Sequence, residues 1–221
     1  MNIACVSYRD WALEIYDKLK LNFSGNHNFL IFRNKEEFDA DQLINFNPDL
    51  ILWYGWSWFV DDLFVDNYSS IMLHPSPLPK YRGGSPIQNQ IINGEKKSAV
   101  TLFKMTRKLD DGDIYKQLPF SLVGSLDDIF KRIIALGYKA TSEIINNDFI
   151  LKKQNYSEAT YFKRLLPVNS EITIEEIKNS SAEYLHNKIR MLNDPYPNAY
   201  IKTSDNKKLY LIKSRLDDDE K

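Results

Sequence analysis

The feature that most constrains the fold is a series of short, nearly continuous apolar segments that alternate with amphipathic ones. Short apolar runs of this kind are typical of strands that are covered on both faces. The predicted strands are residues 2–7, 29–32, 49–54 and 68–73. Between them, residues 11–21 and 38–44 have the spacing of amphipathic helices. Strands alternating with helices form βαβ units, so the sequence predicts an α/β fold with an open, mostly parallel Rossmann-like sheet and helices on both faces.

The second half of the chain predicts one further strand and a long helix. Residues 98–105 have strand propensity. Ser125, with Asp128 three positions on, gives a capping signal for a helix whose apolar stripe continues to about residue 147. This helix is expected to close the main α/β unit.

A smaller unit is predicted after this helix. Residues 153–171 lose their periodicity and are interpreted as a linker. Ser180 and Glu183 form a second capping signal, for a helix that ends near Leu192. Two strands are expected to follow it, at residues 199–203 and 208–213. The sequence thus predicts a main domain at 1–153. Residues 154–221 are expected to form the linker and a small C-terminal helix-and-strand extension. The chain ends in RLDDDEK, which is expected to be a solvated acidic tail.

Composition narrows the classes of partner. The formal net charge of −1 provides no basic field for nucleic acid or an anionic membrane, so we expect neither partner. The single cysteine, Cys5, lies in an apolar run and is expected to be a buried thiol in a reducing compartment. No run approaches the ~18 apolar residues of a membrane span, and the N-terminus lacks the pattern of a signal peptide. These features predict a cytoplasmic protein.

Of the three histidines, His74 has the context of a functional residue. It follows the predicted strand 68–73 directly, at the carboxyl end where open α/β sheets bind ligands. Prolines at 75, 77 and 79 restrict the backbone that follows, so the imidazole is expected to be held in a fixed frame. His27 is interpreted as an exposed loop residue and His186 as a packing or surface residue. A structural role for His74 stays open on these observations alone.

Asp110 is the candidate partner of His74. It lies in a turn after the next predicted strand, so both side chains can reach the same end of the sheet. An aspartate beside a histidine favours the charged imidazolium and suits general acid–base work. The alternative for the cluster Asp110, Asp111 and Asp113 is an exposed acidic turn. Three carboxylates without the spacing of a calcium loop predict no metal site.

Two motifs carry a resemblance to a known family. HPSPLPKYRGGSPIQ, followed by LDDGDI, resembles the signature of the folate-dependent formyltransferases. YFKRLLPVNSEI and KIRMLNDPYPNAYI resemble the segments that join and follow the catalytic domain in methionyl-tRNA and nucleotide-sugar formyltransferases. The resemblance covers residues from about 51 to about 211, and it is strongest to nucleotide-sugar N-formyltransferases.

The resemblance implies transfer of a formyl group from 10-formyltetrahydrofolate to a primary amine by a catalytic domain at 1–153, without a metal. His74 and Asp110 match the family's catalytic histidine and aspartate. Met72 stands where the family has an asparagine that donates a hydrogen bond to the developing oxyanion. Three explanations stay open: imidazolium alone serves the oxyanion, another donor such as Asn89 or a backbone amide substitutes, or the protein is an inactive binding module.

The resemblance also implies the binding residues. The folate cosubstrate is expected to contact the loop of Trp53, Tyr54, Gly55 and Trp56 and the turn of Leu109, Asp111, Gly112 and Asp113. The nucleotide-linked acceptor is expected to contact Arg9, Lys80, Tyr81, Arg82, Gly83 and Tyr161, with Arg9 and Lys80 to Arg82 serving its pyrophosphate and Tyr161 its nucleotide. The alternatives are that the aromatic residues belong to the core and that Lys80 to Arg82 form a solvated loop.

The acceptor amine is predicted from family likeness. The segment SYRDW at 7–11 has no glycine to cradle a phosphate, unlike the glycinamide ribonucleotide enzyme. The compact C-terminal extension resembles that of sugar N-formyltransferases, so the first choice of acceptor is dTDP-4-amino-4,6-dideoxyglucose, in O-antigen or other surface-glycan synthesis, followed by 3-amino-3,6-dideoxyhexoses and GDP-perosamine. The alternatives are a methionyl-tRNA formyltransferase-like enzyme and a non-catalytic binding protein for folate or a sugar nucleotide. The family also implies a homodimer through the C-terminal segment.

Overall fold

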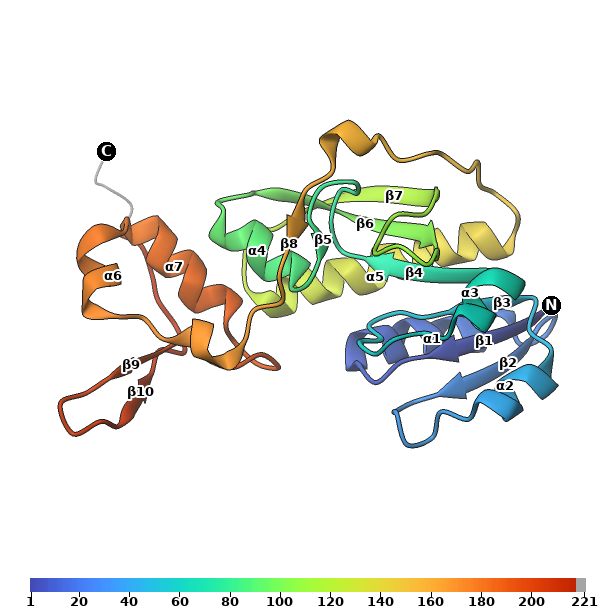
Figure 1. Ribbon diagram of the computed structural model, residues 1–221, viewed down its shortest axis with the longest axis horizontal. Coiled ribbons are helices and arrows are strands. Elements are labelled where there is room, and N and C mark those ends of the chain that lie inside the picture. Colours follow the sequence, from blue (N-terminus) through green and yellow to red (C-terminus); the bar gives the residue numbers. More distant parts are fainter. Residues whose placement is uncertain (218–221) are drawn as a thin grey trace.

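The computed structural model describes residues 1–217 and has a six-stranded α/β sheet at its centre (Figure 1). The sheet order is β2-β1-β3-β4-β6-β7. Its strands are β1 Asn2–Val6, β2 Asn28–Phe32, β3 Leu50–Leu52, β4 Ser70–His74, β6 Lys97–Lys104 and β7 Ile114–Ser121. The four N-terminal strands are mutually parallel, and β6 and β7 continue the sheet in antiparallel fashion. The open, mostly parallel α/β sheet predicted from the sequence is confirmed.

Helices cover both faces of this sheet because successive strand residues point to opposite sides. In β1, Ile3 and Cys5 join the core under the helices α1 and α5, whereas Ala4 and Val6 join the core under α2 and α3. The helices of this region are α1 Asp10–Phe23, α2 Ala40–Phe46, α3 Asp62–Asn67, α4 Pro86–Ile92 and α5 Leu126–Ile145. Burial also raises the pKa of the Cys5 thiol. The strands therefore read as continuous apolar runs because both of their faces are covered.

Local signals in the sequence agree with most helix ends. The predicted capping box forms at α5, where the Ser125 side chain accepts from the Asp128 amide and the Asp128 carboxylate accepts from Ser125. The second capping prediction is displaced by one residue, because Ser181 rather than Ser180 caps the later helix α7 (Ala182–Met191). Strand β7 was not predicted from the sequence; its Pro119 and alternating polar residues suit the edge strand that it forms.

The predicted linker is docked on the main unit. Its two-residue strand β8 (Tyr161–Phe162) pairs in parallel with β5 (Arg82–Gly83), which follows the His74 loop. Two short 3₁₀ turns flank β8, at Tyr156–Glu158 and Pro167–Ser170. This pairing brings the segment after residue 160 to the loop that bears the family motif.

The C-terminal extension consists of helices and a hairpin, as expected. It contains α6 Ile174–Asn179, α7, β9 Tyr200–Lys202 and β10 Lys208–Tyr210, with β9 and β10 antiparallel. Helix α7 packs against α4, and Ile189 and Met191 belong to the same buried cluster as the main sheet. The boundary at 153/154 stays a prediction. Residues 218–221 of the predicted acidic tail lie outside the described residues, and none of the helices within 1–217 has both the length and the apolar character to cross a membrane.

Candidate active site

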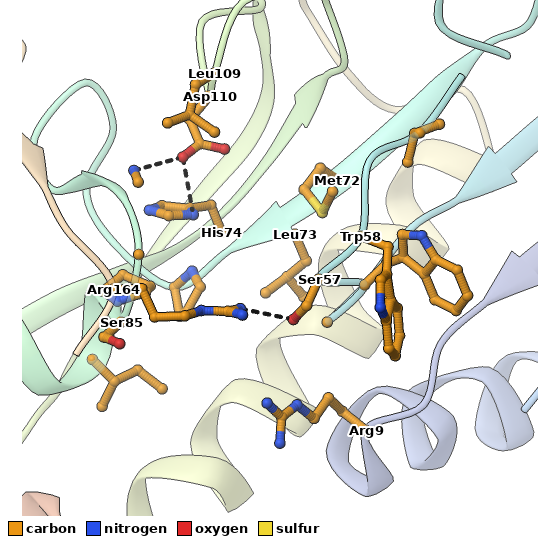
Figure 2. Close-up of a pocket in the computed structure, with 18 of the residues that line it drawn as sticks. Arg9, Ser57, Trp58, Met72, Leu73, His74, Ser85, Leu109, Asp110 and Arg164 are labelled. Carbon is orange, nitrogen blue, oxygen red and sulfur yellow. Dashed lines mark hydrogen bonds and ion pairs between the residues drawn. The ribbon is translucent and has the colours of Figure 1, made fainter. Parts of the chain in front are cut away.

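A cavity of about 650 Å³ lies at the carboxyl ends of the parallel strands (Figure 2). Ligands of open α/β sheets bind at this edge, and the volume is in the range of small-molecule sites. Its wall is built from the loops after β1, β3 and β4, the turn before β7 and the C-terminal extension. Predicted site residues on this wall are Arg9, Gly55, Trp56, His74, Gly83, Leu109 and Asp110.

His74 is the last residue of β4 and is only 6 % exposed. Its Nε2 lies 2.8 Å from the carbonyl oxygen of Tyr81. A carbonyl oxygen can only accept, so Nε2 carries a proton and donates it in this hydrogen bond. Nδ1 is therefore the ring position that can take up and return a second proton.

Asp110 faces this second position. Its Oδ2 lies 3.8 Å from His74 Nδ1 and accepts a hydrogen bond of 2.8 Å from the Gly83 amide. A carboxylate at this distance stabilises the imidazolium more than the neutral ring. Asp110 itself has a left-handed backbone, with φ of 51°, which is unusual for a residue other than glycine. At 3.8 Å the carboxylate forms a charge contact with Nδ1, while the hydrogen bond from Nε2 to the Tyr81 carbonyl oxygen fixes the orientation of the ring.

The turn that carries Asp110 is held by Arg82. This guanidinium is 1 % exposed, donates to the Asp111 carboxylate at 2.7 Å and to the Tyr161 hydroxyl at 2.8 Å, and also bonds to Gln154. The Gln154 amide in turn donates to the carbonyl oxygens of Asp110 and Gly112. Arg82, Asp111 and Tyr161 were predicted as ligand contacts, and this placement corrects that prediction: they are engaged with one another, and none lines the cavity.

The other two residues of this turn that were predicted to contact the cosubstrate, Gly112 and Asp113, lie off the cavity wall. Gly112 is buried away from the cavity, and a Cβ built on it would lie 1.6 Å from the Lys104 carbonyl oxygen, so the turn passes directly against β6. Asp113 accepts from the Lys104 amide through its backbone and does not line the cavity. The glycine of LDDGDI therefore permits a close backbone approach that places Asp110.

The aromatic loop after β3 divides into two groups. Trp56 lines the cavity together with Gly55, as the sequence analysis expected. The side chains of Trp53 and Tyr54 are in the core instead, where Trp53 donates to Ser70 at 3.1 Å and the Tyr54 hydroxyl bonds to Thr141 at 2.9 Å. The prediction that these two side chains wall the cosubstrate is corrected, because both are buried below the cavity.

The predicted pyrophosphate contacts are likewise divided. Lys80 is exposed and outside the cavity wall, and the Tyr81 side chain is buried against Phe162 with its hydroxyl donating to Glu95. Neither side chain reaches the cavity, which corrects both predictions. Arg9 does line it, because Gly55 leaves room for the Arg9 stem: a Cβ on Gly55 would lie 2.9 Å from Arg9 Cγ.

Met72 lines the cavity near His74, as Figure 2 shows. Its thioether has no proton to donate. Asn89, the suggested substitute, is not on the cavity wall and uses its amide for the carbonyl oxygens of Gly84 and Lys163, at 2.8 and 3.3 Å. Asn89 is therefore excluded as the replacement donor in this arrangement.

Several residues of the wall were not predicted from the sequence. Trp58 and Phe59 extend the aromatic side, Arg164 reaches the cavity from the linker, and Tyr196 reaches it from the C-terminal extension. The motif YFKRLLP contains Arg164, but its position depends on the pairing of β5 with β8, which no local pattern reveals. Among residues 1–217 there is no group of histidine, cysteine and carboxylate side chains suited to hold a metal ion.

Comparison with known proteins shows the family. The fold and the site define an α/β protein with a ligand cavity at a histidine–aspartate pair. Family models for "Formyl transferase" and "Formyl transferase, C-terminal domain" match residues 15–144 and 176–221. The chain belongs to the formyl transferase family.

Individual relatives agree with this membership. The methionyl-tRNA formyltransferase of Mycoplasma capricolum is 33 % identical over 90 % of this chain and 63 % of its own length. That of Ehrlichia canis is 28 % identical over 81 % of the chain, which spans 58 % of that relative.

Among solved structures, a methionyl-tRNA formyltransferase from Clostridium thermocellum is similar, with a TM-score of 0.84, 32 % identity, and coverage of 92 % of this chain and 88 % of that one. A sugar N-formyltransferase from a Shewanella species shares the fold, with a TM-score of 0.76, 17 % identity and 98 % coverage of both chains. At this identity the comparison with the sugar N-formyltransferase shows a shared fold.

Proposed function

We propose that the protein transfers a formyl group from 10-formyltetrahydrofolate to the primary amine of a nucleotide-linked amino sugar. The observation that carries the proposal is the His74–Asp110 pair on the wall of a ligand-sized cavity in a member of the formyl transferase family. The aromatic side of the cavity, with Trp56 and Trp58, suits a flat folate ring. Family membership does not define the acceptor of the formyl group, and the amino sugar is the acceptor proposed for it.

The proposed chemistry uses the geometry of His74. The amine nitrogen forms a bond to the formyl carbon, the bond from that carbon to the folate nitrogen breaks, and one proton moves from the amine to the departing nitrogen. Nδ1 of His74 accepts and returns this proton, while Asp110 stabilises the charged ring between the two transfers. Nε2 stays bonded to the Tyr81 carbonyl, which keeps the ring orientation fixed during the cycle.

Met72 affects the stabilisation of the tetrahedral intermediate. An oxyanion develops on the formyl oxygen, and removing one donor to such an oxygen costs about 3 kcal/mol in characterised enzymes. Asn89 is already hydrogen-bonded elsewhere, and of His74 and Asp110 only the His74 imidazolium carries a positive charge that can stabilise the oxyanion. The proposal therefore assigns His74 both the proton and the charge.

A direct assay tests the proposed function. The protein is incubated with 10-formyltetrahydrofolate and a panel of dTDP-, UDP- and GDP-linked amino sugars, and mass spectrometry detects the gain of one CO unit with release of tetrahydrofolate. A formylated sugar nucleotide is expected. Retained folate binding without any product across the panel would instead indicate a non-catalytic binding protein.

Methionyl-tRNA is the second candidate acceptor, because the curated relatives described above are methionyl-tRNA formyltransferases. The same assay therefore includes charged initiator tRNA. The net charge of −1 favours the small acceptor, since RNA binding relies on basic residues that contact phosphates. Formylation of the tRNA with no product from the sugars would replace the first proposal by this one. A homodimer through the extension stays a prediction, to be measured by light scattering.

A further inference from the structure

Two arginines come together at the end of the cavity away from Asp110. In Figure 2, Arg9 and Arg164 lie on the same side of the space below His74, with Asp110 above it. Neither guanidinium forms an ion pair with a carboxylate within residues 1–217. Arg164 bonds to Ser57 Oγ at 2.9 Å, and Arg9 lies over the Tyr8 ring at 4.5 Å. Two positive charges on a cavity wall without a protein anion favour an anionic ligand.

Arg164 is held there by its backbone. A Cβ on Gly84 would lie 2.4 Å from the Arg164 Cα, so the linker chain packs directly on this glycine. The Leu165 amide donates to Ser85 Oγ at 3.0 Å, and the Asn89 amide donates to the Lys163 carbonyl oxygen. The segments on both sides of Arg164 are therefore fixed to the motif loop, and only its side chain projects over the cavity.

A buried amide completes this end of the cavity. Gln88 lines the wall, is 2 % exposed, and its Nε2 has no hydrogen-bond partner in the described part of the chain. Tyr196 lines the same wall next to Gln88, and burial raises the pKa of its phenol, whereas the Gln88 side chain and the charges of Arg9 and Arg164 lower it. The contact between Gln88 and Tyr196 does not reach hydrogen-bond geometry, so the Gln88 Nε2 donor still lacks an acceptor in the described part of the chain. An unpaired buried donor is costly unless a ligand supplies an acceptor.

We infer that Arg9, Arg164, Gln88 and Tyr196 form a subsite for a phosphate or diphosphate group of the acceptor. The inference rests on the proposed function, in which the acceptor amine belongs to a phosphate-bearing molecule. A phosphate presents several acceptor oxygens, which match the two guanidinium groups, the amide and the phenol. The subsite replaces the loop of Lys80 to Arg82, which the sequence analysis expected to bind this group.

Binding measurements on the intact protein test the subsite without turnover. Inorganic pyrophosphate, thymidine diphosphate and a CCA trinucleotide are titrated calorimetrically into wild type, Arg9→Met and Arg164→Met, and 5-formyltetrahydrofolate is titrated in parallel. Loss of one charge-assisted contact is expected to weaken pyrophosphate and thymidine diphosphate about tenfold or more, with folate affinity unchanged. Lys80→Met is the matched control, since it removes an exposed cation outside the cavity, and its affinities should equal those of wild type.

Gln88→Leu separates binding from a structural role. Replacing an unpaired buried donor by an apolar group of similar size is expected to leave the melting temperature unchanged or raise it, while pyrophosphate affinity falls several-fold. A Gln88→Leu protein that melts lower and binds pyrophosphate as wild type does would overturn the role given to this amide.

The outcomes distinguish the sources of the phosphate and the two proposals. Weakened thymidine diphosphate with an unaffected trinucleotide supports a nucleotide-linked acceptor, and the reverse supports an RNA phosphate. Weakened folate with unchanged pyrophosphate, or no binding of pyrophosphate to wild type, overturns the subsite. If Arg164→Met still transfers the formyl group with an unchanged acceptor KM, the subsite is overturned and the proposed function stays in place. If the arginine variants lose pyrophosphate binding but the wild-type protein transfers no formyl group to any acceptor, the proposed function is overturned and the subsite stays in place.

Discussion

The two ends of the cavity differ in what holds their polar groups. At the proposed reacting end, His74 is buried and Asp110 is partly buried, both are bonded to the backbone of the motif loop, and Arg82 fixes the turn behind them. At the acceptor end, Arg9 and Arg164 have no carboxylate partner among residues 1–217. Groups that carry out proton transfer gain from fixed geometry, whereas groups that bind a charged ligand must keep their donors available. In the proposed function, one cavity therefore separates catalysis at the His74 end from acceptor recognition at the Arg164 end.

The largest expected effect on turnover comes from replacing His74 or Asp110, the two residues of the proposed reacting end. His74→Asn removes the proton acceptor, and Asp110→Asn removes the charge that supports the imidazolium, so each variant should lower kcat by about 10²–10⁴-fold. Steady-state formyl transfer with the best amino sugar of the panel measures this, and near-normal turnover by either variant would contradict the assigned pair. Folate titration of both variants checks that the cavity is intact.

The next effect is on stability and comes from replacing Arg82, which holds the turn that carries Asp110. Arg82→Met leaves the partly buried Asp111 carboxylate and the buried Gln154 amide oxygen without their cation, so the loss should approach the cost of breaking a buried ion pair, about 3–5 kcal/mol. Urea unfolding should show this loss in the free energy of unfolding. Lys80→Met, two residues away and exposed, is expected to change it by less than about 0.5 kcal/mol. Equal stability of the two variants would show that the Arg82 network does not hold the turn.

A smaller effect is expected from crowding the turn itself. Gly112→Ala forces the chain away from the Lys104 carbonyl oxygen and should destabilise the protein by at least about 1–3 kcal/mol while lowering kcat, because Asp110 moves with the turn. A Cβ on Gly25 would meet no heavy atom within 4 Å, so Gly25→Ala serves as the control. Thermal unfolding and turnover of the two variants measure both consequences.

The smallest effect concerns Met72. An asparagine introduced there adds a donor beside His74, so Met72→Asn should leave kcat unchanged or raise it, with stability little altered at this partly exposed position. Kinetics at saturating substrate give the answer. A sharp fall in kcat would mean that the site relies on the thioether and positions another donor around it.

The sequence predicts the first half of the fold better than the site. Apolar runs identify the strands up to β4 because those strands are buried on both faces, whereas β7 is a polar edge strand with a proline and gives no such pattern. His74 and Asp110 were identified because both follow strand ends. Arg82 was predicted to bind the acceptor and Arg164 was not predicted at all. The positions of both depend on the pairing of β5 with β8, which joins residues about eighty positions apart in the chain.

The most direct test compares kcat and KM for the acceptor in Asp110→Asn and Arg164→Met. If the reacting and acceptor ends are separate, Asp110→Asn lowers kcat with little change in acceptor KM, and Arg164→Met raises acceptor KM about tenfold or more while acting much less on kcat. The account would be contradicted if Arg164→Met lowered kcat as strongly as Asp110→Asn does, with the acceptor KM unchanged in both.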